Sequence, residues 1–127
     1  MAEVTILRDI SLRRKEILEK VSDENREYAE SYLKHINVSA YERTTISSKI
    51  QMLLHYLEFI ADHLNNKSIK DISVSEMEDY LLYLGSECHL EPNSIAKHMS
   101  DISVFYKFLI SKGVSTFNPI YYYFTSF

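Results

Sequence analysis

Two stretches of the sequence place hydroxyl, amide and basic side chains where the hydrophobic pattern predicts the start of a helix. Side chains of this kind contact phosphate groups or base edges, and lysine or arginine adds positive charge. The free N–H groups of a first helical turn and the helix dipole also attract phosphate. The candidate residues of the two stretches are Arg43, Thr44, Thr45, Ser48 and Lys49, and then Asn93, Ser94, Lys97 and His98.

An ordinary capped helix start explains the same residues, because serine, threonine and asparagine are preferred N-cap residues. Two such starts do not by themselves exclude that interpretation. The overall charge gives no support for a polyanionic ligand, since the formal net charge is −4 and the isoelectric point is about 5.7. Any contact with a nucleic acid must therefore depend on the local placement of charge.

No other cluster of residues predicts chemistry. The five histidines lack the spacing of metal ligands. The acidic residues Glu76, Glu78 and Asp79 suit the positive end of a helix dipole, and Cys88 has no basic residue nearby in the sequence to activate it. We therefore expect no catalytic residue, no metal and no cofactor in this chain.

The composition indicates one helical domain. A chain of 127 residues suits a single domain, and two glycines and two prolines are few for the turns of a β-sandwich. No apolar run reaches the length of a membrane span, and a single cysteine excludes an internal disulfide. We expect a cytoplasmic protein without a membrane partner.

Apolar residues at a period of 3.6 predict four core helices preceded by one more. Serine or threonine starts three of them, and glycine ends two. The expected helices cover residues 6–21, 22–36, 44–64, 73–85 and 92–112. The longest has an apolar face of Ile46, Ile50, Leu53, Leu54, Leu57, Ile60, Ala61 and Leu64. The aromatic tail after Pro119 is left open between a strand and a packed extension.

Three segments, in order, resemble the SAM-like core-binding domain of phage integrases and tyrosine recombinases. The segment YERTTISSKIQMLLHYLEFI resembles its second helix, and IKDISVSEMEDYLLYL resembles its third. The segment LEPNSIAKHMSDISVFYKFLISKGVSTFNP is similar to the fourth, including the Phe-Tyr-x-Phe-Leu run, the glycine and the closing Asn-Pro. The resemblance covers Ser22–Pro119.

The resemblance implies an all-α, SAM-like four-helix core-binding domain with an extra N-terminal helix. Residues 1–21 would be a helical N-terminal extension, 22–119 the core-binding domain, and 120–127 the start of a linker or tail. In the family, Asn118-Pro119 would be the hinge toward a catalytic domain.

The same resemblance implies that the domain clamps duplex DNA at a recombination site and positions a separate catalytic domain. The catalytic domain would supply the tyrosine nucleophile and a His-x-x-Arg motif. This sequence contains no His-x-x-Arg motif, so this chain is not expected to be an enzyme. Lys107 joins the two helix starts as a DNA contact. The expected partners are double-stranded DNA, the C-terminal catalytic domain of the parent recombinase, and a second copy of the chain on DNA, at the nucleoid.

Two alternatives remain. The first is a helical protein–protein interaction module without a DNA role, which the acidic isoelectric point favours. The second is a stand-alone regulator that competes with a full-length recombinase and cleaves no DNA. One coherent basic face would favour DNA, whereas an exposed apolar groove would favour a protein partner.

Overall fold

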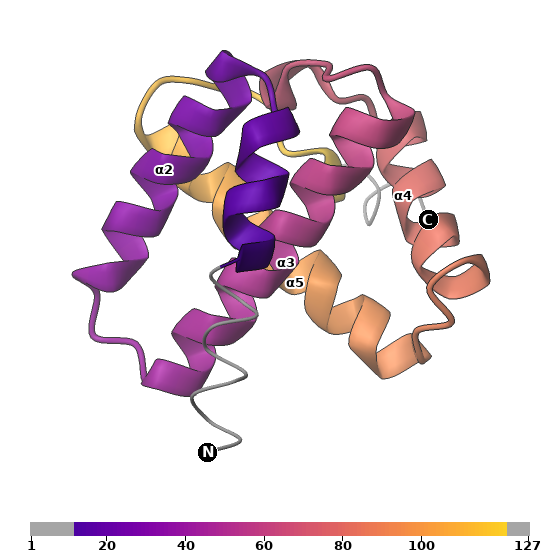
Figure 1. The fold of residues 1–127 in the computed structure, drawn as a ribbon, viewed down its shortest axis with the longest axis horizontal. Helices are drawn as coiled ribbons and strands as arrows, with labels where there is room; N and C mark the ends of the chain where they lie inside the picture. The colour runs from indigo at the N-terminus through magenta and orange to yellow at the C-terminus, as the bar shows by residue number, and fades with distance from the viewer. Residues whose placement is uncertain (1–11, 122–127) are drawn as a thin grey trace. The chain divides into compact units, whose positions relative to one another are not determined.

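The computed structural model describes residues 12–121, and all regular structure in this range is helical. The chain divides into two compact units between Asn66 and Lys67, and each unit is described by itself. Figure 1 shows the helices in chain order. The expectation of an all-α fold is confirmed.

The first unit contains a helix over residues 12–20, followed by α2 (Asp23–Asn37) and α3 (Arg43–His63), which pack against each other. The predicted N-cap of α2 is confirmed, because the Ser22 hydroxyl accepts a hydrogen bond from the N–H of Asn25. Apolar residues of all three helices form the core of this unit; they include Ile17, Tyr32, Leu33, Leu53, Leu57 and Ile60.

The helix over residues 12–20 is part of this core and is also tied to α3 by charge. Ile17 and Val21 are buried, and Arg13 forms an ion pair with Glu58. Lys20 pairs with both Glu58 and Asp62. Although burial acts to lower the pKa of Lys20, hydrogen bonds to these two carboxylates raise it above the ordinary value. The predicted segment before residue 12 lies outside the described residues.

The second unit begins with the short 3-10 helix η1 (Ile69–Asp71) and continues with α4 (Val74–Ser86) and α5 (Pro92–Ser111), which pack together. The buried Tyr106 hydroxyl donates a hydrogen bond to the Ile69 carbonyl at 2.9 Å. This bond connects η1 to α5. Its loss would be costly, because the buried hydroxyl would then have no hydrogen-bond partner.

The two glycines of the sequence behave differently. Gly113 has φ of +73° directly after α5, so the predicted glycine stop is confirmed there. Gly85 instead lies inside α4, which continues to Ser86, and the prediction that this glycine ends the helix is wrong. The turn to α5 comes later, where His89 has φ of +55°.

Several of the described residues after Gly113 are buried. Residues 119–121 are helical, Pro119 is buried, and Ile120 is 1% exposed. This resolves the start of the tail as a packed helical extension, whereas residues 122–127 lie outside the described range. None of the helices in the described residues is both long and apolar enough to cross a membrane.

Candidate nucleic-acid interface

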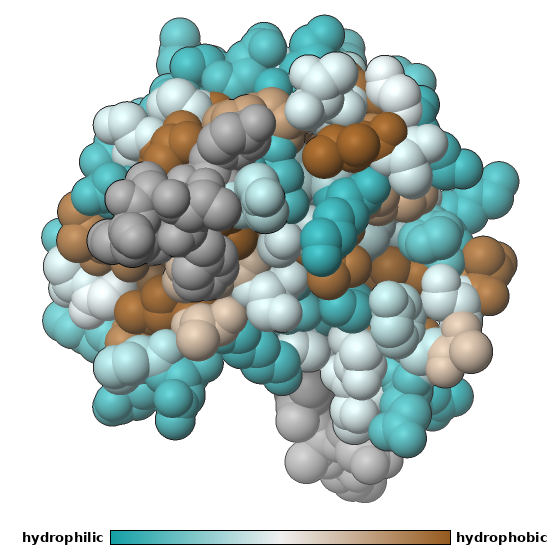
Figure 2. Space-filling model, turned by 180° about the vertical axis from the view of Figure 1, so that it is seen from behind, coloured by the Kyte–Doolittle hydropathy of each residue, from teal (hydrophilic) through white to brown (hydrophobic). Residues whose placement is uncertain are grey.

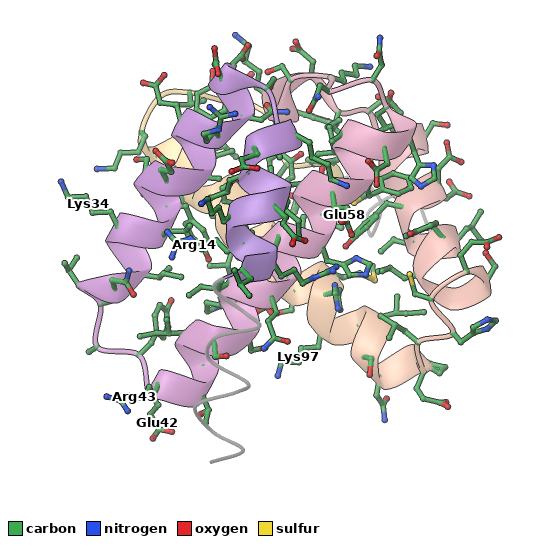
Figure 3. The ribbon with its side chains drawn as sticks, viewed as in Figure 1. Arg14, Lys34, Glu42, Arg43, Glu58 and Lys97 are labelled. Carbon is green, nitrogen blue, oxygen red and sulfur yellow. The ribbon has the colours of Figure 1, made fainter. Side chains whose placement is uncertain are left out.

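The start of α3 presents three residues whose backbone N–H groups precede the first helical hydrogen bond. Arg43, Thr44 and Thr45 are the first three residues of the helix, and the ladder begins with the N–H of Ile46 donating to the Glu42 carbonyl. Arg43 and Thr44 are exposed, and Thr45 is half-buried. Figure 3 shows Arg43 beside Glu42 at this end of the helix. These N–H groups form an anion-binding arrangement.

Neither threonine is the N-cap of α3, contrary to the prediction that one of them opens the helix. Glu42 occupies the N-cap position, and its side chain makes no cap hydrogen bond. The first turn of α3, which lies entirely within the described residues, contains no acidic residue, although Glu42 precedes it at the N-cap. Thr44 is an exposed residue within this first turn.

The start of α5 has the same arrangement. Glu91 is the N-cap without a side-chain cap bond, Pro92 occupies the first position, and the first turn of this fully described helix contains no acidic residue. Asn93 and Ser94 follow, and both are exposed. Proline has no N–H, so Asn93 and Ser94 supply the N–H groups that lie before the first helical hydrogen bond.

Lysines continue the polar side of α5 beyond its first turn. Lys97 and Lys107 are exposed, and Figure 3 shows Lys97 projecting from the helix. The one acidic residue within α5, Asp101, is 9% exposed. The outer surface of α5 therefore carries positive charge even though the whole chain is acidic. His98 is half-buried and Ser100 is exposed.

Lys49 is not an exposed contact residue, and its predicted role at the surface of α3 needs correction. Its side chain is 6% exposed, and its ammonium group lies 5.2 Å from the centroid of the Tyr41 ring. An ammonium group over the face of an aromatic ring is stabilised by a cation–π interaction. Lys49 therefore packs against the connection between α2 and α3 and is not an exposed DNA contact. Ser48, the preceding residue, is half-buried.

A hollow on α5 was not predicted from the sequence. It has a volume of about 320 Å³ and is lined by small, apolar and polar residues: Ala96, Met99, Ser100, Ser103, Val104, Lys107 and Ile120. Several of these follow a spacing of four, three and four residues along α5, which places them on one side of a helix. That spacing was visible in the sequence, but the contribution of Ile120 requires the fold after Gly113.

Predicted contact residues thus fall into two groups, one in each unit. The start of α3 brings together Arg43, Thr44 and Thr45 in the first unit. α5 brings together Asn93, Ser94, Lys97, His98 and Lys107 in the second. No group of three or more histidine, cysteine or acidic side chains in the described range could hold a metal ion.

A comparison with models of protein families finds a match. The family model described as "Phage integrase, N-terminal SAM-like domain" matches residues 28–116. Neither the curated proteins nor the solved structures yield a match. The matched range contains α3, η1, α4 and α5 in full, and it begins after the helix over residues 12–20.

Proposed function

The chain belongs to the family of phage integrase N-terminal SAM-like domains, and from this membership we propose that it binds duplex DNA through the starts of α3 and α5. In this proposal the chain clamps DNA at a recombination site and positions the catalytic domain of a parent tyrosine recombinase. The chain itself supplies binding and no chemistry, and a second copy binds the same DNA. The core-binding part is residues 22–119.

The observation that carries the proposal is the open first turn of α3 and of α5. Both helices lack a side-chain cap bond and an acidic residue in the first turn, and both expose polar residues there. A DNA phosphate placed at such a turn accepts hydrogen bonds from N–H groups and interacts with the positive end of the dipole. Arg43 and Lys97 add a full positive charge close to each start.

Phosphate contacts set the register of the protein on DNA, whereas base contacts select the sequence. Thr44, Asn93 and Ser94 are short polar side chains exposed at the two starts, so they are the candidates for reading base edges. Lys107 contributes from the later part of α5, about 15 Å along the axis from Lys97 at 1.5 Å per residue.

Few cations are available for these contacts, and this limits the affinity of the domain. Arg13 and Lys20 are engaged with Glu58 and Asp62, and Lys49 is buried. Each neutralised phosphate releases counterions, so a site with three or four cations binds with modest affinity and a shallow salt dependence. We infer that the domain relies on the rest of a recombinase for tight binding.

Fluorescence anisotropy with a labelled duplex of mixed sequence tests the proposal. Arg43→Ala combined with Lys97→Ala should weaken binding roughly tenfold or more at about 50 mM salt, and it should lower the slope of log K against log salt by about 2. Lys70→Ala, which removes an exposed lysine of η1, is the matched control. Equal affinity of the double variant and the control variant would contradict the proposal.

The protein–protein alternative depends on exposed apolar side chains. Val38 is 80% exposed and Tyr41 is 42% exposed, both in the connection from α2 to α3, and Leu82 of α4 is 64% exposed. In Figure 2 the hydrophobic residues on the visible face form separate groups with hydrophilic residues between them. Such a distribution gives less support to a protein partner than one broad apolar groove would.

A further inference from the structure

Asn118 lies in the segment that follows α5, and its side chain joins two elements of the second unit. It is 7% exposed, and it directly precedes Pro119 and the helical residues 119–121. The two ends of its amide have different partners. A buried polar side chain satisfied at both ends has a defined orientation.

The oxygen of the Asn118 amide caps the following helix. Its Oδ1 accepts hydrogen bonds from the N–H of Ile120 at 3.1 Å and from the N–H of Tyr121 at 3.4 Å. Asparagine is a favoured N-cap, and proline is favoured at the first helical position that follows it. Asn118-Pro119 is therefore a helix start, and the chain after it is directed by that helix.

The nitrogen of the same amide ties this helix start to α5. The Asn118 Nδ2 donates to the Ser103 hydroxyl at 3.1 Å and lies 3.4 Å from the Ser103 carbonyl oxygen. Ser103 is four residues before Lys107, and both residues line the hollow on α5. Ile120, which also lines the hollow, follows the cap by two positions, so the tether also holds a part of the hollow in place.

The turn before Asn118 is closed by its own hydrogen bonds. The Ser115 hydroxyl donates to the Phe117 carbonyl at 3.0 Å and accepts from the Phe117 N–H at 3.2 Å. Ser115 is 5% exposed. Gly113 supplies the reversal after α5, with its N–H donating to the Ile110 carbonyl. Each step from α5 to the helix start therefore has a specific backbone constraint.

We propose that Asn118 is a positioning residue that fixes the direction in which the chain leaves α5. This goes beyond the proposed function and rests on it in one respect, namely that α5 is the helix placed on DNA. A rigid exit holds the described residues up to Tyr121 in a fixed orientation relative to α5. Asn118-Pro119 is accordingly a fixed joint, in contrast to the hinge that the family resemblance implies.

Substitutions at Asn118 and Ser103 can separate the capping of the following helix from the hydrogen bonds to α5. Asn118→Asp combined with Ser103→Ala keeps an oxygen that caps the helix and loses both bonds to Ser103, because a carboxylate does not donate and alanine has no hydroxyl. Asn118→Ala removes both functions. Asn37→Asp, at an exposed residue of α2, is the control for the chemical change. Ser103→Ala removes one of the two acceptors from the other side.

Amide residual dipolar couplings and backbone order parameters of the whole chain provide the measurement. In the native chain, the couplings of Ile120 and Tyr121 should fit the alignment tensor obtained from α5. Their backbone order parameters should be about 0.85, the value of a rigid backbone. In Asn118→Asp combined with Ser103→Ala, helical chemical shifts at these residues should persist. Their couplings should depart from the α5 tensor, and their order parameters should fall to below about 0.6.

Ser103→Ala alone should give an intermediate departure, and Asn37→Asp should give none. The proposal is overturned if Ile120 and Tyr121 do not follow the α5 tensor in the native chain. It is equally overturned if the tether variants leave both couplings unchanged. Because the readout contains no DNA, its failure is distinguishable from a failure of the proposed function, which the anisotropy titration reports separately.

Discussion

The consecutive helices α4 and α5 begin in opposite ways. At the start of α4, the Ser73 hydroxyl accepts from the N–H of Glu76, and the Glu76 carboxylate accepts from the N–H of Ser73 at 3.0 Å. Lys67 also donates to that carboxylate at 2.7 Å. At the start of α5, Glu91 makes no side-chain cap bond and the first turn contains no acidic residue.

This difference separates a helix start that is satisfied internally from one that is available to a ligand. A capping box occupies N–H groups of the first turn, and its carboxylate offsets the positive end of the dipole. The same contrast occurs in the first unit, where Ser22 caps α2 and Asp23 and Glu24 follow, while α3 lacks both features. The open starts are those with the proposed DNA contacts.

Charge follows the same division in the second unit. α4 contains Glu76, Glu78 and Asp79 and no lysine or arginine. α5 contains Lys97 and Lys107, and Lys112 follows directly. Acidic net charge in the chain is thus compatible with a basic outer surface on one helix, because the two signs are carried by different helices.

Glu42 and Glu91 each place a carboxylate at the N-cap position of an open start, where it would repel a bound phosphate. Glu42→Gln combined with Glu91→Gln should raise the affinity for a mixed-sequence duplex by about tenfold, which corresponds to about 1.4 kcal/mol. Anisotropy titrations at low salt measure this gain. Glu78→Gln, in α4, is the control and should leave the affinity nearly unchanged. A similar gain in all variants would indicate an effect of net charge alone.

Ser73→Ala should lower the free energy of unfolding by about 1 kcal/mol, because it removes the hydroxyl that caps α4. Ser94→Ala should change it by less than about 0.5 kcal/mol, since Ser94 is exposed and lies inside the first turn of α5. Urea unfolding monitored by circular dichroism measures both. Equal destabilisation by the two substitutions would remove the distinction between closed and open starts.

The capped start of α4 should contribute less to the stability of the fold at acidic pH. Burial acts to raise the pKa of Glu76, but hydrogen bonds from Lys67 and Ser73 lower it below its ordinary value of 4.5. A carboxyl group with a lowered pKa in the folded state stabilises the fold above its unfolded pKa, and this contribution is lost as the pH falls through the folded pKa. Stability should therefore decline below about pH 4.5, and less steeply in Glu76→Gln. Identical pH profiles would show that this pair contributes nothing.

The order and approximate bounds of the helices were predictable, because apolar periodicity and local capping depend on nearby residues. Ser73 illustrates this, since the spacing Ser-x-x-Glu already indicates a capping box. The N-cap of α3 was not predictable in the same way. Glutamate is not a favoured cap, so the rule selects Thr44 or Thr45 although the helix begins earlier, at Arg43 after Glu42.

Tertiary packing explains the other departures. Ile46 and Ile50 are half-buried whereas Lys49 between them is buried, because the Tyr41 ring offers the ammonium group a partner. Gly85 lies within α4, which ends one residue later at Ser86. Asn118 could be recognised as a turn residue, but its tether to Ser103 depends on residues fifteen positions apart that meet only in the folded chain.

The most direct test of DNA binding at open helix starts is a titration of the isotope-labelled chain with a mixed-sequence duplex, followed by amide NMR spectra. The account predicts that the largest shifts occur at the first turns of the open helices, at Thr44, Thr45, Asn93 and Ser94. The first turn of α4, from Val74 to Glu76, should remain unchanged. Shifts of equal size at all helix starts, or shifts confined to Val38, Tyr41 and Leu82, would contradict it.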